Sequence, residues 1–260
     1  MDLDLRNKVV LITGGAMGIG AAIVRAAVAE GAAAAIADRC EEPARQLAEE
    51  LRAAGGKVHV VPGDLSTVEN CKRAVEETLV TFGRIDALVN NAGVNDRVGL
   101  EHGSPADYRA SLERNLLHYY DMAHYALAAL KESRGSIVSI ASKTAVTGQG
   151  GTSGYVSAKG AILALTREWA VELLPYGIRV NAVVPAEVMT PLYRSWLDTF
   201  PDPDARLAAI VSRIPLGHRM TTPDEIAAMA VFLISSKAAH ITGQHVFVDG
   251  GYTHLDRALS

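Results

Sequence analysis

Val9-Val10-Leu11-Ile12-Thr13-Gly14-Gly15-Ala16-Met17-Gly18-Ile19-Gly20 is the stretch that decides how this chain folds. The apolar run Val9–Thr13 is typical of a buried strand, and an Ala-rich helical pattern follows the glycines over about residues 20–30. Glycine lets backbone approach a phosphate and lets a helix pack closely on a strand. The free N–H groups at the start of that helix would point at a diphosphate. A turn without a ligand is the alternative, but glycines between a strand and a helix favour nucleotide binding.

Short apolar runs and longer helical patterns alternate along the rest of the chain. Strands are expected at Ala33–Ala37, Val58–Pro62, Ala87–Val89, Ser136–Ile140, Arg179–Val184 and His245–Val248, and helices at Pro43–Ala54, Val68–Phe82, Asp107–Leu130, Tyr155–Leu174 and from Thr222 to about Ser235. Thr222-Pro223-Asp224-Glu225 has the pattern of a capping box with proline at the first helical position.

Strands this apolar, without polar alternation, are typical of a parallel sheet that is covered on both faces. The repeated strand–helix order implies right-handed crossovers and a doubly wound sheet. The sequence therefore predicts an α/β fold, with residues 1–260 as one domain and residues 251–260 as its C-terminal tail. Ligands of such sheets bind at the carboxyl ends of the strands.

The composition argues against several other classes of protein. The 260 residues are 49% hydrophobic and carry a net charge of −4, so the basic footprint of a nucleic-acid-binding protein is missing. No apolar stretch approaches the roughly 18 residues of a membrane span, and the first residues, Met-Asp-Leu-Asp-Leu-Arg, do not resemble a signal peptide. Cys40 and Cys71 suggest neither a disulfide framework nor a zinc site, so we expect no metal and a cytoplasmic location.

Asp38 ends the second predicted strand, 18 residues after Gly20. An acidic residue at this place can accept hydrogen bonds from the adenosine ribose, and its charge would repel a 2′-phosphate. That favours NAD as the cofactor. Arg39 could instead bind such a phosphate, so NADP stays open, and Asp38 could also simply cap the next loop.

Three motifs resemble the short-chain dehydrogenase/reductase family. Thr13–Gly20 resembles its TGxxxGxG element, Asp64-Leu65 its adenine contact, and Asn90-Asn91-Ala92-Gly93 its NNAG element. The resemblance runs from about residue 6 to 251 and implies a single Rossmann domain with seven parallel strands. The cofactor contacts that it implies, with those given below, are Gly14, Met17, Gly18, Ile19, Gly20, Asp38, Arg39, Asp64, Leu65, Asn91, Ala92, Gly93, Tyr155, Lys159, Pro185, Val188 and Thr190.

Tyr155 and Lys159 are spaced to share one face of a helix. A nearby ammonium favours the phenolate, so Lys159 should lower the pKa of Tyr155 from its ordinary value near 10. Tyr155 could then act as a general base that removes a hydroxyl proton while hydride leaves the same carbon for the nicotinamide. A packed tyrosine with a solvated lysine is the ordinary alternative.

Two further residues complete the catalytic set. Ser142 follows the strand Ser136–Ile140, and its hydroxyl could hydrogen-bond the reacting oxygen. Asn115 matches the family's helix asparagine, which by resemblance holds a water in a proton relay through the lysine. Lys159 would also contact the nicotinamide ribose. The alternatives are that Ser142 only caps a turn and that Asn115 only kinks its helix.

Pro185-Ala186-Glu187-Val188-Met189-Thr190 resembles the family's PGxxxT pattern. By resemblance the Thr190 hydroxyl binds the nicotinamide carboxamide. Ala186 stands where the family has glycine; we expect the contact to survive because alanine adds one methyl group.

Substrate selectivity must come from the loops over about residues 94–100, 143–152 and 186–218. They carry polar side chains and aromatic surfaces, namely Asn95, Asp96, Lys143, Gln149, Glu187, Tyr193 and Trp196. Such a set suits a polyhydroxyl substrate, whereas a steroid or fatty-acyl pocket would be more apolar. Each of these side chains could instead face solvent.

A narrower resemblance, to bacterial L-fucose dehydrogenases, is carried by Val94–Asp96, Ser142–Gly150, Pro185–Tyr193 and Tyr252–Leu259. Those enzymes oxidise the anomeric hydroxyl of a sugar to a lactone. The resemblance implies a sugar as the small-molecule substrate, L-fucose first and L-galactose or D-arabinose next. The implied sugar contacts are Gln149 and Glu187 above all, with Asn95, Lys143 and Tyr193.

Other functions and the assembly state stay open. A 3-oxoacyl thioester or a 2-keto-3-deoxy sugar acid could be the substrate, and a nicotinamide-binding sensor without turnover is an alternative of another class. By resemblance, the helices at Asp107–Leu130 and Tyr155–Leu174 are buried in a homotetramer. The tail, which ends in Ala258 and Leu259, could pack across that interface or fray.

Overall fold

A computed structural model describes residues 2–255 of the chain. Within these residues, seven strands form one parallel sheet in the order β3-β2-β1-β4-β5-β6-β7. The strands are β1 Val9–Thr13, β2 Ala33–Asp38, β3 Lys57–Pro62, β4 Ala87–Asn90, β5 Ser136–Ile140, β6 Arg179–Pro185 and β7 His245–Val248. The predicted fold class is confirmed. The order reverses between β1 and β4, which is where open α/β sheets bind their ligands.

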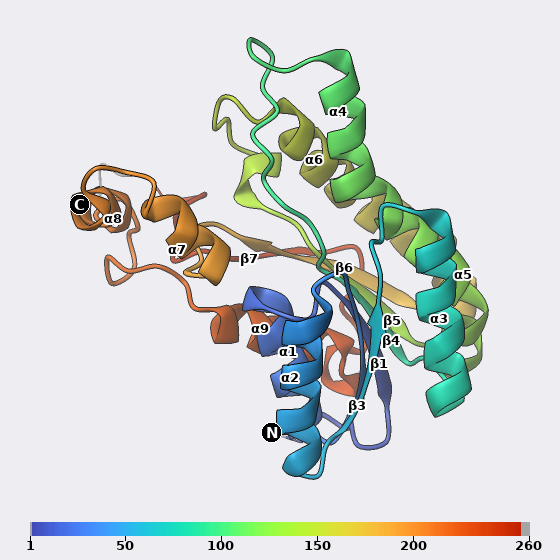
Figure 1. The fold of residues 1–260 in the computed structure, drawn as a ribbon. Coiled ribbons are helices and arrows are strands. Elements are labelled where there is room, and N and C mark those ends of the chain that lie inside the picture. The colour runs from blue at the N-terminus through green and yellow to red at the C-terminus, as the bar shows by residue number, and fades with distance from the viewer. Residues whose placement is uncertain (1, 256–260) are drawn as a thin grey trace.

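Helices cover both faces of this sheet (Figure 1). The helices α1 Gly18–Ala29, α2 Glu41–Ala53 and α9 Pro223–Ile234 lie on one face, and α3 Val68–Phe82, α5 His118–Ser133 and α6 Ser153–Glu172 lie on the other. Ile12 of β1 packs toward the first group, whereas its neighbour Leu11 packs toward the second. Because every residue of β1 and β5 is buried, the strands show no polar alternation.

The helix predicted from Asp107 to Leu130 is interrupted. It begins as α4 Pro105–Leu112, which a capping box between Ser104 and Asp107 starts. A π-helical turn, η1 Glu113–Leu117, follows and leads directly into α5. The expectation of one regular helix was therefore wrong at the turn that contains Asn115, and π turns of this kind are frequent at functional sites.

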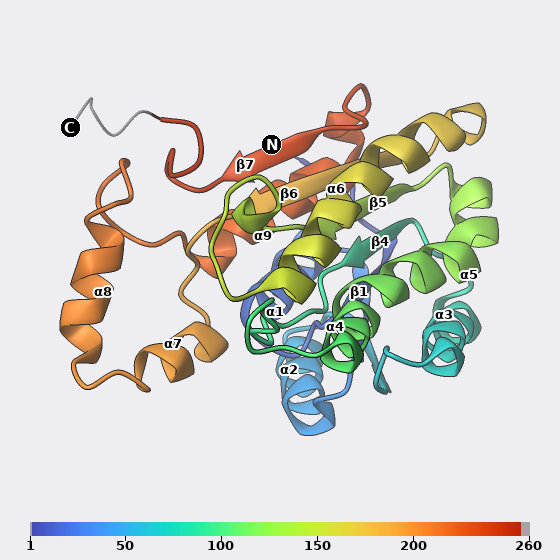
Figure 2. The ribbon, with the colours of Figure 1, turned by 90° about the horizontal axis from the view of Figure 1, so that it is seen from above.

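The segment expected to be a loop over residues 186–218 contains two helices, α7 Pro191–Leu197 and α8 Pro203–Val211. Thr190 and Asp202 cap them, each followed by proline at the first helical position. The same device starts α9, where the predicted capping box of Thr222 and Glu225 is confirmed. Seen from above, α7 and α8 stand beside the sheet rather than on either face (Figure 2).

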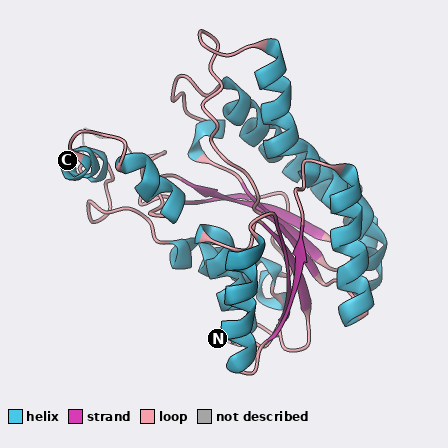
Figure 3. Ribbon diagram, viewed as in Figure 1, coloured by secondary structure: helices cyan, strands magenta, loops and turns pink. Residues whose placement is uncertain are grey.

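Short 3₁₀ turns complete the secondary structure: η2 Lys143–Ala145, η3 Leu174–Tyr176 and η4 Ser236–Ala238. The loops of Figure 3 gather at the carboxyl ends of the strands. Over the described residues, no helix combines the length and apolar character needed to cross a bilayer, and no group of histidines, cysteines and carboxylates there could hold a metal ion.

Candidate active site

A cavity of about 440 Å³ opens at the carboxyl ends of the strands. Its walls come from the turn after β1, the ends of β2 to β6, and the helices α6 and α7. The predicted cofactor residues that line it are Gly14, Met17, Gly18, Ile19, Asp38, Arg39, Asp64, Leu65, Asn91, Ala92, Gly93, Tyr155, Lys159, Pro185, Val188 and Thr190. Residues predicted from distant parts of the sequence thus share one cavity.

The glycine turn is shaped by close backbone contacts. Gly14 and Gly18 have φ angles of 62° and 56°, in the region that disfavours other residues. A Cβ on Gly20 would lie 2.0 Å from the carbonyl oxygen of Gly14. Gly20 is not among the residues that line the cavity, so its part is to let α1 pack against the turn.

The start of α1 is suited to an anion. Met17 occupies the N-cap position, and its side chain makes no capping hydrogen bond to the described residues. No N-cap side chain therefore occupies the backbone N–H groups of the first turn of α1, at the positive end of the helix dipole. These N–H groups can bind an anion. Asn91 fixes the turn opposite by donating to the carbonyl oxygens of Gly14 and Thr13, at 2.9 and 3.1 Å. The site therefore fits a dinucleotide diphosphate.

Asp38 combines the two roles that the sequence left open. One carboxylate oxygen accepts from the backbone N–H of Ala16 and the other from that of Cys40, both at 2.9 Å. It therefore caps the loop, and it also lines the cavity. A carboxylate has further lone pairs, so these contacts orient Asp38 without exhausting its capacity to accept from a ribose. Arg39 beside it is exposed at the rim.

Asp64 lines the same cavity as Asp38. The N–H of Ser66 does most to hold the pKa of Asp64 below its ordinary value, and the charge of Arg39 adds to it. The side chains of Asp38 and Asp64 are thus fixed by backbone contacts.

Three of the predicted catalytic residues line the cavity together: Ser142, Tyr155 and Lys159. Ser142 is the N-cap of η2 and accepts from the Thr144 N–H at 3.3 Å and from the Thr144 hydroxyl at 3.0 Å. Ser142 therefore caps this turn and also lines the cavity, so the capping role does not exclude the catalytic role. Because its oxygen accepts from Thr144, its own hydrogen stays available to donate.

The pKa of Tyr155 departs from the sequence expectation. Burial raises it above its ordinary value, and a hydrogen bond with Ser142 offsets this only in part. The expected net lowering by Lys159 is thus not found, because desolvation penalises the phenolate more than these contacts stabilise it. Burial also lowers the pKa of Lys159, to about 7.

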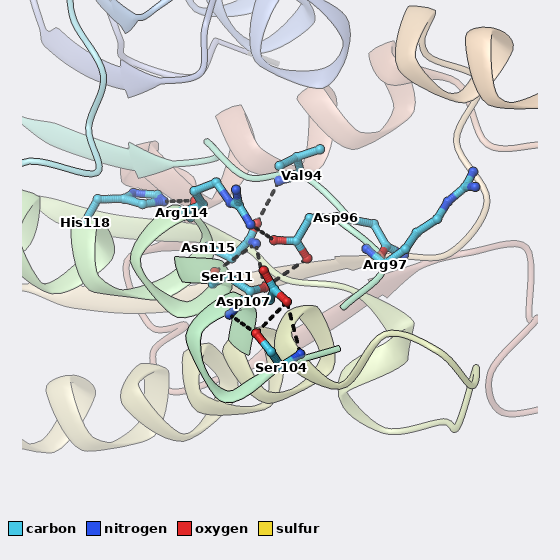
Figure 4. Close-up of polar contacts among 10 residues, drawn as sticks. Val94, Asp96, Arg97, Ser104, Asp107, Ser111, Arg114, Asn115 and His118 are labelled. Atoms are coloured by element: carbon cyan, nitrogen blue, oxygen red, sulfur yellow. Dashed lines mark hydrogen bonds and ion pairs between the residues drawn. The ribbon is translucent and has the colours of Figure 1, made fainter. Parts of the chain in front are cut away.

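Asn115 is buried and is not among the cavity-lining residues. Figure 4 shows its side chain between Val94 and Ser111. Its Oδ1 accepts from the Val94 N–H at 2.7 Å, and its Nδ2 donates to the Ser111 carbonyl at 3.0 Å. A Cβ on Gly93 would lie 3.1 Å from this Oδ1 and 3.6 Å from the Lys159 Nζ. The glycine thus lets Asn115 and Lys159 approach the same point of the chain.

The predicted substrate residues fall into two groups. Lys143 and Glu187 form an ion pair, and Glu187 accepts from the Tyr193 hydroxyl at 2.6 Å. Asn95 and Tyr193 line the cavity, whereas Lys143 and Glu187 lie directly behind Tyr193. Gln149 is exposed and is not part of the lining of the cavity.

Sequence reasoning missed several residues of the site. His118, Arg114 and Leu192 line the cavity, Thr144 binds Ser142, and the Tyr119 hydroxyl accepts a hydrogen bond from Lys159. His118 and Tyr119 follow Asn115 by three and four residues, so helical spacing could have identified them. Leu192 was missed because its segment was expected to be a loop.

The known proteins that this chain resembles are dehydrogenases and reductases. Residues 14–253 match the family described as "Enoyl-(Acyl carrier protein) reductase". The chain is 41% identical over 246 residues to the L-fucose dehydrogenase of Mus musculus, covering 94% of this chain and 88% of that protein. The crystal structure of Cj0485 dehydrogenase is similar with a TM-score of 0.95 and 46% identity, covering 100% of this chain and 99% of the other. The ligand-free aldohexose dehydrogenase of Thermoplasma acidophilum has a TM-score of 0.89 and 31% identity, covering 99% and 98%.

Proposed function

This chain belongs to the short-chain dehydrogenase/reductase family, and we propose that it is an NAD-dependent sugar dehydrogenase that oxidises the anomeric hydroxyl of L-fucose, or of a related aldose, to the lactone. One observation carries the proposal: a single cavity is lined by the glycine turn and by Ser142, Tyr155 and Lys159. The family membership makes the chain an oxidoreductase that uses NAD or NADP. The sugar substrate and the preference for NAD are our proposal.

In the proposed reaction, Tyr155 accepts the proton of the sugar hydroxyl. Ser142 donates a hydrogen bond to the reacting oxygen and keeps that oxygen beside the phenol. Lys159 stabilises the phenolate that Tyr155 must become. When bound, the nicotinamide accepts the hydride and brings a positive charge to the site. That charge would offset the burial that raises the pKa of Tyr155.

The proposal of NAD rather than NADP rests on Asp38. Two backbone N–H groups hold its carboxylate in the cavity wall, so its negative charge cannot easily turn away from a 2′-phosphate. Arg39 is exposed and free of such constraints, and it could reach a phosphate only at the rim. The fixed charge should therefore decide the preference.

The proposal of a sugar rests on the polar network of Lys143, Glu187 and Tyr193, together with Asn95. In this network Lys143 and Glu187 pair with each other, and Glu187 accepts from Tyr193. Tyr193 and Asn95 line the cavity, so a sugar hydroxyl would meet the network at the Tyr193 phenol. Gln149 would join it only if its exposed loop closes over the substrate. The similarity to L-fucose dehydrogenases, at 41% identity, makes L-fucose the first substrate to test.

Two observations argue against the other functions. A 2-keto-3-deoxy sugar acid would bring a carboxylate to a place where Glu187 already neutralises Lys143. A sensor without turnover would not need Tyr155 and Lys159, and both line the cavity. A 3-oxoacyl thioester stays the alternative substrate, because the chain is also 34% identical over 250 residues to a 3-oxoacyl-[acyl-carrier-protein] reductase of Thermotoga maritima.

A panel of aldoses with NAD and with NADP tests the proposal. The formation of reduced cofactor is followed by absorbance, and lactone formation by its hydrolysis to acid. We expect L-fucose, L-galactose or D-arabinose to reduce NAD at least tenfold more efficiently than NADP. Reduction of a 3-oxoacyl thioester by NADH or NADPH, without oxidation of any aldose, would overturn the sugar assignment.

We also propose that the enzyme is a homotetramer. Leu117 and Tyr120 are exposed on one helical face, and Val171 is 70% exposed on α6. These helices are the ones that family tetramers bury. The end of the tail, with Ala258 and Leu259, lies outside the described residues. Light scattering on the purified protein tests this assembly, and a monomer would contradict it.

A further inference from the structure

The ammonium group of Lys159 is held by oxygen atoms from two neighbouring elements. Its Nζ donates to the carbonyl oxygen of Ile140, at the end of β5, at 2.7 Å. It also donates to the hydroxyl of Tyr119, on α5, at 3.1 Å. Lys159 is 3% exposed and Tyr119 is fully buried, so water does not compete for these contacts.

The hydrogen bonds of the Tyr119 hydroxyl are consistent with a charged lysine. The hydroxyl donates to Ile140 at 3.1 Å and accepts from Lys159, so its hydrogen and one lone pair are both used. An ammonium has three hydrogens to donate. Two are used here, and the third can point toward the cavity that Lys159 lines.

Among residues 2–255, the other groups around Lys159 do not supply a negative charge. The centroid of the Tyr155 ring is 5.6 Å from Nζ, and Asn115 Oδ1 lies nearby under Gly93. Burial, with the charge of Lys159 added to it, lowers the pKa of His118 to about 4, so this ring is neutral near pH 7. Hydrogen bonds to neutral oxygens must therefore stabilise the ammonium against burial, which lowers its pKa to about 7.

We propose that Tyr119 is a positioning residue: its buried hydroxyl, together with the carbonyl of Ile140, holds Lys159 in its charged form one helical turn from Tyr155. Tyr119 acts through Lys159 rather than on the reacting atoms. Its kinetic consequence rests on the proposed function, but the contact itself can be tested without cofactor or substrate.

The first test uses the cofactor-free protein. The titration of Lys159 is followed by the ¹³Cε shift of ¹³C-lysine-labelled protein, with Lys159→Arg to assign the signal. We expect Tyr119→Phe to lower the titration midpoint by about one pH unit, since a hydrogen bond to a charged group is worth roughly that much. Tyr120→Phe, at an exposed position on the same helix, is the matched control and should not change it. An unchanged midpoint in Tyr119→Phe would overturn the proposal.

The second test is the pH profile of kcat/KM for oxidation. Because a less charged Lys159 stabilises the Tyr155 phenolate less, we expect the acid limb of Tyr119→Phe to move to higher pH. The alkaline plateau should stay within about twofold, because the reacting groups are intact. A lower melting temperature with an unmoved profile would mean that Tyr119 only packs, and would overturn the proposal. A shifted lysine midpoint in a protein that oxidises no sugar would support the positioning role and overturn the proposed function.

Discussion

Lys143 and Glu187 pair with each other behind the cavity wall, and their side chains are only 11% and 16% exposed. The Tyr193 hydroxyl donates to the same carboxylate, so the pair joins the loop after β5 to α7. A largely buried pair is costly to break, because the remaining partner keeps an uncompensated charge. A neutral sugar that binds at Tyr193, which lines the cavity, brings no charge that would break the pair, and this is the basis of the first prediction.

Glu187→Gln should impair sugar binding more than cofactor binding. The change keeps the size of the side chain but removes the charge that Lys143 and Tyr193 contact. The loss of hydrogen bonds to a charged group is worth about 1.5–3 kcal/mol. We therefore expect the KM for L-fucose to rise about tenfold or more, while the KM for NAD stays within about twofold. Initial-rate kinetics with each substrate varied provide the measurement.

Asp198→Asn is the matched control, since Asp198 pairs with Arg194 on the surface of α7. An exposed pair of this kind contributes little, so neither KM should change. An equal rise of both KM values in Glu187→Gln would show that the pair supports the fold in general and not the sugar site.

Tyr155→Phe should abolish turnover and spare the cofactor. It removes the proposed proton acceptor but leaves the ring that lines the cavity. General-base catalysis contributes roughly 10²–10⁴-fold, so we expect kcat to fall at least a hundredfold. The Kd for NADH, measured by fluorescence quenching, should stay within about threefold. Turnover near that of the wild type would contradict the assignment of Tyr155.

Asp38→Asn should weaken the preference for NAD. The amide no longer repels a 2′-phosphate, and its one oxygen can accept from the backbone N–H of either Ala16 or Cys40, which bind different oxygens of Asp38. We expect kcat/KM for NADP to rise about tenfold relative to that for NAD. The ratio of the two values, which is insensitive to the fraction of folded protein, is the measurement. An unchanged ratio would assign the preference to another residue, with Arg39 the first to test.

The sequence predicted the sheet well because each strand is an apolar run between turn residues. For β1, β5 and β7 the expected and observed bounds coincide, and the ends of the others differ by one residue. The helices α7 and α8 were missed because the polar character of their segment favoured a loop. Thr190-Pro191 and Asp202-Pro203 carry the same start signal that identified the helix at Thr222-Pro223.

The candidate site was predictable where a motif places residues at the end of a strand, as with Ser142 and Asp38. It was not predictable where two helices meet. Lys159 and Tyr119 are 40 residues apart and contact each other across α5 and α6, and no spacing rule connects them. The raised pKa of Tyr155 was missed for a related reason: burial depends on the packed cavity, whereas the sequence indicates only the neighbouring lysine.

His118 should make the stability of the protein depend on pH. Burial does most to lower its pKa from 6.5 to about 4, and the charge of Lys159 adds to this. Between these values the unfolded chain binds a proton that the folded chain excludes, so stability is complete above pH 6.5 and is lost as the pH falls toward 4. The loss amounts to about 3 kcal/mol at most.

Urea unfolding of wild type and His118→Asn at several pH values measures this dependence. The variant should lose less stability than the wild type between pH 6.5 and 4, whatever its stability at pH 7. Parallel curves for the two proteins would assign the acid sensitivity to other groups.

Gly20→Ala should damage the fold of the glycine turn and, through it, cofactor binding. The new Cβ would lie 2.0 Å from the Gly14 carbonyl oxygen and 2.7 Å from the Asn91 Nδ2, and the first of these atoms is backbone. Since α1 must move away from the turn to relieve the contact, we expect a loss of roughly 1–3 kcal/mol or more in the free energy of unfolding. The displaced N–H groups of α1 should also weaken NADH binding at least tenfold. Gly148→Ala is the control, because nothing lies within 4 Å of its Cβ and its loop is exposed; it should unfold at the wild-type urea concentration. If Gly20→Ala and Gly148→Ala unfold at the same urea concentration, α1 and the glycine turn are not packed as closely as cofactor binding at this site requires.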